Sequence, residues 1–377
     1  MMGNSDRVTP TMLEKVISAD SHVIEPPDVW SARLTGKFRD AAPKLVSDDK
    51  TDRIVCAGMK LEFPVGLAAG VMRRDDEVRA EGRWEEDVPR SAYDPDARIA
   101  AMEQDGLAGE VLYPTLGSSM FGIADHELLW AFLDAFNSWF GEFCSAHPTK
   151  LKGIGMLVLD EGDGDVAAEG LKKARDQGLS GVMIPLDVDG AERLLVPEFD
   201  RFWATAQDLQ VPVHFHASSN RSGKLISNNS VVDFVLEPVV MERTLCGLIF
   251  GGLFDRYPRL QAVSAENDAS WVANICERAD YVSRRYRKLR ADQLNNTRIP
   301  SEIITNNWSF TFTRDFAAPA VAEVTGIRVM WGSDFPHNVS TWPNSREFLG
   351  TQLKGRSPET VQGSTYRNAS RLYGFPA

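Results

Sequence analysis

Cysteine and histidine are both scarce in this chain of 377 residues, which has four cysteines and six histidines. The cysteines lie far apart in the sequence and form no CxxC pair. This spacing argues against a disulfide framework and against a zinc site built from thiolates. We therefore expect reduced cysteines and a cytoplasmic location.

Long apolar runs and an excess of positive charge are also missing. No apolar run approaches the roughly 18 residues that span a bilayer, and residues 1–10 are polar, unlike a secretory signal. The chain carries 53 acidic against 41 basic residues, a formal net charge of −12. Because an acidic chain repels phosphate backbones, we expect neither nucleic-acid binding nor membrane association.

The rest of the composition is ordinary for a folded protein, with 43% hydrophobic and 25% charged residues. Short apolar segments alternate with longer segments whose apolar residues recur at helical spacing. The predicted strands are 16–19, 110–113, 153–159, 181–185, 212–215, 260–265, 308–312 and 327–331. The predicted helices are 125–146, 165–176, 197–209 and 239–250.

Alternation of strands and helices favours parallel strands joined by right-handed crossovers. Eight such units predict an α/β fold, a distorted (β/α)8 TIM barrel, in a single domain over residues 1–377. An open doubly wound sheet is the alternative, but no GxGxxG follows the first strand. Residues 38–96 are an insertion between strands one and two. We interpret them as a lid or oligomer segment, with a solvated loop as the alternative.

Four of the charged and imidazole side chains stand in pairs where predicted strands end. Asp20 and His22 end the first strand, and His214 and His216 end the fifth. Residues two apart on a strand point to the same face, so the members of each pair point together. A single histidine at a strand end is more often structural, but two such pairs indicate a shared site.

Further acidic and imidazole groups follow later strands. Glu266 follows the sixth strand, and Asp334 and His337 follow the eighth. Because barrels place their active sites at the C-terminal ends of strands, these side chains should converge. Imidazole and carboxylate ligands suit Zn²⁺, Mn²⁺ or Fe²⁺. The predicted ligands of one or two such divalent ions are Asp20, His22, His214, His216, Glu266 and Asp334.

Several motifs are similar to those of the amidohydrolase superfamily, in the amidohydrolase-related branch that includes aminocarboxymuconate-semialdehyde decarboxylase. Segment 20–27, DSHVIEPP, resembles the metal motif of its first strand, and segment 332–337, GSDFPH, resembles the motif of its eighth strand. The other similar segments are YDPDAR at 93–98, MEQDG at 102–106, LYPT at 112–115, PVHFH at 212–216 and FDRYPRL at 254–260. The resemblance implies a distorted barrel with a divalent metal at its mouth.

The resemblance also implies roles for individual residues. By the family pattern His22, His216 and Asp334 are metal ligands, and Asp20 stands where the family often has a histidine or glutamate. Glu266 is a departure, because family decarboxylases carry a histidine after the sixth strand as general acid and base. A carboxylate does not supply an imidazole proton, which argues against simple non-oxidative decarboxylation.

Together these residues predict a metal-dependent enzyme acting on a small carboxylated substrate through metal-activated water or a metal-polarised carbonyl. Asp334 would hold the metal or accept a proton, and Glu266 or His337 would shuttle that proton. Hydrolysis is favoured over decarboxylation. Candidates for binding the substrate carboxylate are the arginine and asparagine side chains of the insertion at 38–96 and those near Asn220 and Arg221.

Two other hypotheses remain open at this point. The first is an O₂-activating hydroxylase with a mono- or dinuclear iron or manganese site, similar to aminoisobutyrate hydroxylase. The second is a non-catalytic barrel that serves as a subunit of a larger complex. In each case a homo- or hetero-oligomer is expected.

Overall fold

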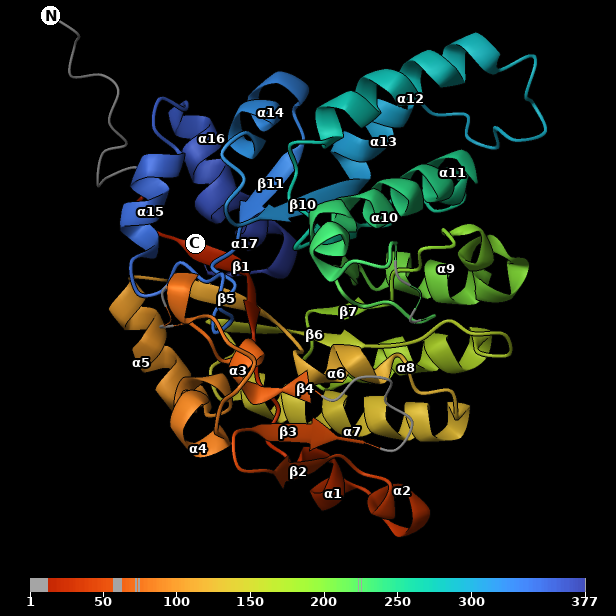
Figure 1. The fold of residues 1–377 in the computed structure, drawn as a ribbon. Coiled ribbons are helices and arrows are strands. Elements are labelled where there is room, and N and C mark those ends of the chain that lie inside the picture. The colour runs from red at the N-terminus through yellow and green to blue at the C-terminus, as the bar shows by residue number, and fades with distance from the viewer. Residues whose placement is uncertain are drawn as a thin grey trace, which may run out of the picture.

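The computed structural model describes residues 13–56, 63–71, 73, 75–222, 224 and 226–376. Its centre is a sheet of eight parallel strands in the order β1-β5-β6-β7-β8-β9-β10-β11, with helices arranged around it (Figure 1). The strands are β1 Ile17–His22, β5 Gly109–Tyr113, β6 Leu151–Met156, β7 Gly181–Met183, β8 Val213–His216, β9 Ala262–Ala265, β10 Trp308–Phe312 and β11 Arg328–Trp331. All eight predicted strands are confirmed, and so is the barrel.

The barrel closes where the ends of β1 and β11 meet. The main-chain N–H of Asp334 donates to the carbonyl of Asp20 at 2.8 Å, and the N–H of His22 donates to the carbonyl of Phe335 at 2.6 Å. Gly332 permits this approach, because a Cβ added there would lie 2.4 Å from the Cβ of Asp20. A residue with a side chain at this position would force the two strand ends apart.

The longer helices lie around the sheet. They are α5 Pro95–Asp105, α7 His126–Ser145, α8 Gly164–Asp176, α9 Asp200–Asp208, α10 Ser230–Phe250, α12 Val272–Tyr286, α13 Pro300–Asn307, α14 Ala318–Thr325 and α15 Ser345–Gln352. Among them, α7, α8, α13 and α14 pack directly on strands. The shorter ones are α1 Val29–Arg33, α2 Gly36–Asp40, α3 Val65–Ala68, α4 Trp84–Asp87, α6 Leu116–Met120, α11 Leu253–Arg256, α16 Pro358–Gln362 and α17 Asn368–Tyr373. None of the helices described is both long enough and apolar enough to cross a membrane.

The predicted helix at 239–250 begins nine residues too late. Helix α10 begins at Ser230, where the side chain of Asn229 accepts a hydrogen bond from the N–H of Val231 at 3.0 Å. The extra turns lack an amphipathic pattern, because they expose large apolar side chains. Phe234 and Val235 are each 73% exposed. Exposed apolar patches often mark interaction surfaces, and the expected oligomer stays a prediction.

The insertion at 38–96 contains a small antiparallel sheet of β2 Lys44–Ser47, β3 Asp52–Val55 and β4 Phe63–Pro64. Ile54 is fully buried, and Arg83 pairs with Asp52 at 3.0 Å. The insertion reaches the mouth of the barrel, because a Cβ added at Gly70 would lie 2.7 Å from the Cβ of Asn338. The described part is therefore packed rather than a solvated loop, and its role as a lid or oligomer segment stays a prediction.

A buried ion pair ties the end of β1 to its neighbours. The Arg98 side chain on α5 is fully buried, and its Nε donates to Glu110 Oε2 on β5 at 2.5 Å. Its Nη1 donates to the main-chain carbonyl of His22 at 2.7 Å. The guanidinium also lies over the ring of Phe335, 4.7 Å from its centre. One side chain therefore joins α5, β5, β1 and the segment after β11.

We expect Glu110→Gln to lower the free energy of unfolding by about 3–5 kcal/mol, because it leaves a buried guanidinium without its counter-charge. Urea unfolding followed by circular dichroism measures the change. The matched control is Glu103→Gln on α5, the helix that carries Arg98; the carboxylate of Glu103 is exposed and pairs with Lys150 at 3.4 Å. The control should stay within about 0.5 kcal/mol of the parent. A loss below about 1 kcal/mol for Glu110→Gln would show that the pair does not anchor the strand.

Asp105 joins the end of α5 to the start of α15. Its carboxylate accepts the N–H of Ser345 at 2.9 Å and the hydroxyl of Ser345 at 2.5 Å. Burial raises the pKa of Asp105 above its ordinary value, in spite of these two hydrogen bonds. The native state therefore binds a proton here more readily than the unfolded chain does.

This raised pKa predicts the sign of a pH effect on stability. The contribution of Asp105 is fully present below its ordinary pKa of 3.8 and is lost as pH rises through the raised value. In Asp105→Asn, which keeps both bonds if the Ser345 hydroxyl turns, the free energy of unfolding should fall less steeply with pH. Urea unfolding between pH 4 and 7 measures the slope. The exposed Asp176→Asn serves as control, and equal slopes for Asp105→Asn and the parent would contradict the prediction.

Candidate metal centre

The acidic and imidazole side chains predicted to converge lie at one end of the barrel. Asp20 and His22 lie at the C-terminal end of β1. His216 is the last residue of β8, and Glu266 directly follows β9. Asp334 follows β11 by three residues. Parallel strands end at the same edge of the sheet, so four segments that are distant in the sequence meet there.

Three of these side chains form a group with the spacing of metal ligands. Asp20 Oδ1 lies 3.7 Å from His22 Nε2 and 3.5 Å from His216 Nε2. Ligand atoms that each bind one ion at about 2.0–2.2 Å are roughly 3–3.6 Å apart. All three atoms are buried and make no regular hydrogen bond, and the polar groups nearest to them are one another, Asp334 and Glu266. Buried polar atoms without a hydrogen bond are costly, and a bound cation would satisfy all three at once.

Main-chain carbonyls fix the orientation of the two histidines. Nδ1 of His22 lies 3.0 Å from the carbonyl of Pro114, and Nδ1 of His216 lies 2.8 Å from the carbonyl of Ala217. A carbonyl only accepts, so each Nδ1 donates and carries the proton. In a neutral ring the Nε2 lone pair then points toward Asp20, which is the arrangement typical of metal-binding histidines.

Asp334 forms a second group that shares His22 with the first. Its Oδ1 lies 3.2 Å from His22 Nε2 and 3.0 Å from His337 Nδ1. Nε2 of His337 lies 3.0 Å from the hydroxyl of Thr115. Although burial opposes ionisation, the positive charges and hydrogen bonds of His337 and His22 lower the pKa of Asp334 below its usual range. Asp334 is therefore a carboxylate that bridges two imidazoles.

Glu266 borders the first group from the side of β9. Its Oε2 lies 3.5 Å from His216 Nε2, and its side chain is 32% exposed, compared with 1% for those of Asp20 and Asp334. Burial and the negative charge of Asp334 raise the pKa of Glu266 well above its ordinary value. Its backbone has a φ of +56°, and that of Asp334 has a φ of +54°. Non-glycine residues in this left-handed conformation cluster at functional sites.

The two ligand histidines have opposite tendencies to bind a proton. Burial and the positive charge of His337 lower the pKa of His22 to about 4, against the opposing effect of Asp334. Burial also acts against the proton on His216, but the hydrogen bond and charge of Asp20, with the charge of Glu266, raise its pKa to about 10. The carboxylates of Asp20 and Glu266 therefore favour a positive charge next to them.

His214 lies apart from both groups. Its Nδ1 bonds to the hydroxyl of Tyr113 at 2.8 Å, and its ring stacks on Tyr373 with 5.8 Å between centres. Burial and the charge of His216 lower its pKa to about 3. Although His214 and His216 share a strand face, the structure does not bring His214 within ligand distance of the other residues. His214 precedes His216 by two residues on β8, so its side chain lies deeper in the barrel than the ligand side chains.

Two residues of the site were missed by the sequence analysis. The hydroxyl of Thr311 on β10 donates to Asp20 Oδ2 at 2.7 Å and accepts the N–H of Glu266 at 2.8 Å. The ring of Tyr113 lies beneath the two ligand histidines, with its centre 4.8 Å from that of His216. Tyr113 ends its predicted strand, so the strand-end rule could have found it, whereas a threonine inside a strand gives no signal.

A cavity of about 400 Å³ lies at the same end of the barrel as the two groups. Its walls come from α6, from the segments after β7 and β8, and from the start of α10. The apolar part of its lining is Leu186, Val188, Ile226, Phe234 and Val240. Among the described lining residues Lys224 is the one cation, and it pairs with Asp189.

Arg221 does not provide the carboxylate-binding group expected of it. Its guanidinium pairs with Asp160 at 2.7 Å and donates to the carbonyls of Phe121 and Ile123. The guanidinium of Arg221 is therefore already bound by acceptors within the chain. Asn220 is likewise engaged, because its side chain donates to the carbonyl of Lys224.

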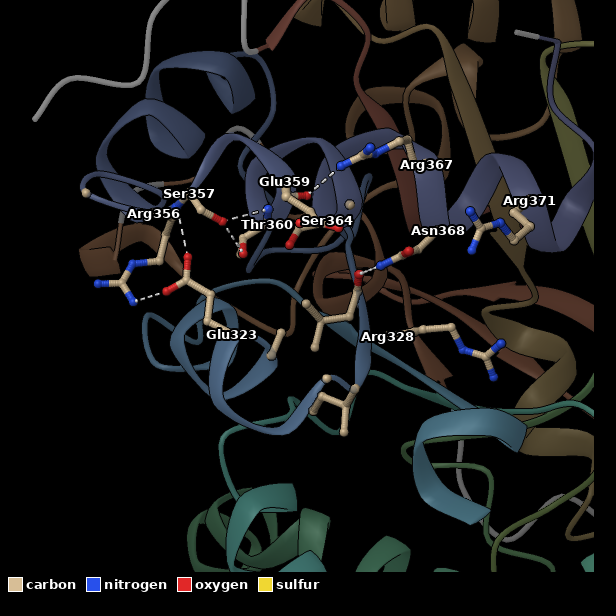
Figure 2. A pocket seen from close by; sticks show the side chains of 16 residues that line it. Glu323, Arg328, Arg356, Ser357, Glu359, Thr360, Ser364, Arg367, Asn368 and Arg371 are labelled. Atoms are coloured by element: carbon tan, nitrogen blue, oxygen red, sulfur yellow. Dashed lines mark hydrogen bonds and ion pairs between the residues drawn. The ribbon is translucent and has the colours of Figure 1, made fainter. Parts of the chain in front are cut away.

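A larger cavity of about 830 Å³ lies at the opposite end of the barrel, where β11 begins (Figure 2). Arg356 pairs with Glu323 at 3.0 Å on one wall, while Arg328 and Arg371 line another. None of the metal-centre residues lines this cavity. It therefore belongs to the end of the barrel that supports stability rather than chemistry.

Comparisons with known proteins agree with this geometry. A family described as amidohydrolase matches residues 62–375. A curated relative is the 2-amino-3-carboxymuconate-6-semialdehyde decarboxylase of Dictyostelium discoideum, which is 23% identical over 196 residues. That match covers 52% of this chain and 54% of the relative. The chain thus spans about half the length of the curated relative it matches.

Solved structures share the fold over almost the whole chain. An amidohydrolase from Mycobacterium avium subsp. paratuberculosis K-10 is 22% identical, with a TM-score of 0.74 and coverage of 96% of this chain and 99% of that one. A 5-carboxyvanillate decarboxylase from Novosphingobium aromaticivorans DSM 12444, complexed with manganese and 4-hydroxy-3-methoxy-5-nitrobenzoic acid, is 19% identical. Its TM-score is 0.68, and coverage is 99% and 100%. With most of its length matched by one family and its barrel shared with these structures, the chain belongs to the amidohydrolase family.

Proposed function

We propose that this chain is a metal-dependent enzyme that removes the carboxyl group from a small oxygen-substituted aromatic acid without an oxidant. The observation that carries the proposal is the meeting of three buried ligand atoms that lack a hydrogen bond, Asp20 Oδ1, His22 Nε2 and His216 Nε2. Their ion-pair contacts are with one another and with Asp334 and Glu266, which are themselves candidate ligands. Buried polar atoms without a hydrogen bond are rare in folded proteins, and this set has the composition and spacing of a divalent-metal site. Decarboxylases among the similar proteins support the reaction class.

The donor set fits a first-row divalent ion. Asp20, His22, His216 and Asp334 would hold it, and Glu266 or His337 would complete the shell or contact the substrate. Nitrogen and oxygen donors without thiolate suit Mn²⁺, Fe²⁺ or Zn²⁺, and one of the similar structures contains manganese. When bound, such an ion polarises substrate oxygens and stabilises negative charge that develops on them.

The cavity at the same end of the barrel as the centre favours a flat apolar substrate. Two of its lining residues, Asp233 and Glu237, are carboxylates, so an acidic group on that substrate would be oriented away from them and toward the metal centre. The apolar side chains of the cavity, including Phe234, would contact a ring. Its one described cation, Lys224, is already paired with Asp189. A substrate carboxylate and an adjacent oxygen would therefore be recognised by the metal centre itself rather than by an arginine of the cavity wall.

Glu266 is placed to handle the proton that the reaction needs. A carboxylate of ordinary pKa would be a poor replacement for the family's histidine, but burial and the charge of Asp334 raise the pKa of Glu266 well above its ordinary value, so this group can hold a proton. Loss of carbon dioxide leaves the electron pair on the ring carbon, and that carbon must then take up one proton. Of the carboxylates in the centre, the Glu266 side chain is the exposed one, at 32%, while Asp20 and Asp334 are closed off. We propose that Glu266 delivers this proton. Asp334 would keep His22 and His337 in place, one on each side of its carboxylate.

Hydrolysis is the second candidate. It would need a second ion held by Asp334 and His337, because the Nε2 that the two groups share on His22 binds only one ion. Asp20, His22 and His216 form one group, and His22, Asp334 and His337 form the other. Two adjacent ions could bind and orient a water molecule for attack on a carbonyl. Counting the metal per chain separates a one-ion centre from a two-ion centre.

We expect His216→Ala to lose at least nine-tenths of its bound manganese, because the variant removes one ligand of the first group. The measurement is elemental analysis after manganese loading and desalting, with circular dichroism to check the fold. His147→Ala is the matched control, since His147 is a surface residue that pairs with Asp96 at 2.8 Å. Equal manganese content in the two variants would place the metal elsewhere.

Manganese-loaded protein should release carbon dioxide from hydroxybenzoates that carry a carboxyl group next to a hydroxyl group, with 5-carboxyvanillate as the first probe. The release should proceed without oxygen. Glu266→Gln should lower kcat by about 10²-fold or more while the metal content is retained, because proton transfer by a placed side chain contributes about 10²–10⁴-fold. Mass spectrometry of the products measures this outcome.

Other products would overturn the proposal in identifiable ways. Cleavage of amide or lactone probes without carbon dioxide would establish hydrolysis. Oxygen consumption with a hydroxylated product would establish the hydroxylase. If the chain binds no metal and is inactive on every probe, the remaining hypothesis is that of a non-catalytic barrel subunit.

A further inference from the structure

Glu25 is a fully buried carboxylate that the proposed chemistry does not use. It follows the last residue of β1 by three positions and is 0% exposed. Its Oε2 accepts the N–H of Leu116 at 2.9 Å, and its Oε1 accepts the N–H of Gly117 at 2.9 Å. Burial raises the pKa of Glu25 to about 7, against the opposing effect of these main-chain amides. A glutamate buried to this extent without a counter-charge is rare and needs a reason.

The loop that Glu25 holds is the loop that orients two histidines of the metal centre. This loop, residues 114–117, consists of the two residues between β5 and α6 and the first two residues of α6. The carbonyl of Pro114 accepts the Nδ1–H of His22 at 3.0 Å. The hydroxyl of the next residue, Thr115, lies 3.0 Å from His337 Nε2. Contacts to the centre and contacts to Glu25 therefore come from consecutive residues, and the loop has little freedom between them.

Gly117 shows how closely the loop packs on the carboxylate. A Cβ added there would lie 2.9 Å from Glu25 Oε1 and 2.5 Å from the methyl carbon of Met156. The absence of a side chain lets the main chain reach both oxygens of Glu25. The hydrogen bonds to Glu25 and the lack of a side chain at Gly117 together fix how closely the loop packs on the barrel.

We propose that Glu25 is a positioning residue whose carboxylate fixes the loop at 114–117 so that Pro114 keeps His22 in its metal-binding orientation and Thr115 keeps His337 against Asp334. The inference rests on the proposed metal-dependent function. The hydrogen bonds of Glu25 go to main-chain amides and not to the ligand atoms, and Glu25 does not line the cavity of about 400 Å³. Its effect passes through main-chain hydrogen bonds, which is how partners behind the ligands tune metal sites in proteins.

Glu25→Gln tests this role, because it keeps the size of the side chain but replaces one acceptor oxygen with an N–H₂ that faces a main-chain N–H. We expect the dissociation constant for Mn²⁺ to rise about 10- to 100-fold. The absorption spectrum of the cobalt-substituted protein should also change, because the ligand field depends on the orientation of His22. Glu242→Gln on α10 is the matched control, since this partly buried glutamate lies outside the loop.

A second variant keeps the test decisive if Glu25→Gln does not fold. Gly117→Ala leaves the carboxylate intact but pushes the loop away from it, so it should weaken Mn²⁺ binding in the same direction. If either folded variant has a lower Tm but an unchanged Mn²⁺ dissociation constant and an unchanged cobalt spectrum, Glu25 is only structural and the inference is wrong. If the parent protein itself binds no Mn²⁺, the proposed function fails instead, so the two failures are distinguishable.

Discussion

The contact between the first and last strands of the barrel is the constraint on which the metal centre depends. Asp20 and His22 come from the first strand, and Asp334 comes from the segment after the last. Two main-chain hydrogen bonds, of 2.8 Å and 2.6 Å, join these strand ends across about three hundred residues of sequence. The same bonds that close the sheet set the distance between the ligands. A shift of this seam by one residue would turn the ligands away from each other.

The cost of gathering acidic groups in a barrel interior explains the neighbours of the centre. Burial disfavours the charged form of a carboxylate and neighbouring carboxylates repel each other, and both effects raise the pKa of Glu266. Fixed donors reduce this cost, such as the Thr311 hydroxyl on Asp20 and the two imidazoles on Asp334. The charge of a divalent ion would reduce it further. The centre is therefore arranged for a cation in its electrostatics as well as in its distances.

Those parts of the site that obey a local rule could be predicted from the sequence. Alternation along a strand gave the pair of Asp20 and His22, and the placement of active sites at strand ends gave Glu266 and Asp334 as neighbours. The rule does not say how deep a side chain lies, which is why His214 was grouped with the ligands although it bonds to Tyr113 below them. Thr311 and Glu25 follow no local pattern, because their partners come from distant strands and loops. The sheet inside the insertion at 38–96 was missed for the same reason, since pairing between short strands has little sequence signature.

The position of the cavities bears on how this barrel recognises a substrate. The larger cavity, with its arginines, lies at the end of the barrel that contains none of the metal-centre residues. The smaller one lies at the same end as the centre and is lined by apolar side chains and by the carboxylates of Asp233 and Glu237. The one cation among its described residues is already paired. An acidic substrate bound there would therefore gain its electrostatic stabilisation from the same ion that activates it. Recognition and chemistry would then depend on one charge, so that an ion bound in a shifted position would weaken both together. On that view, the loop and carboxylate that hold His22 in place matter for substrate selection as much as for catalysis.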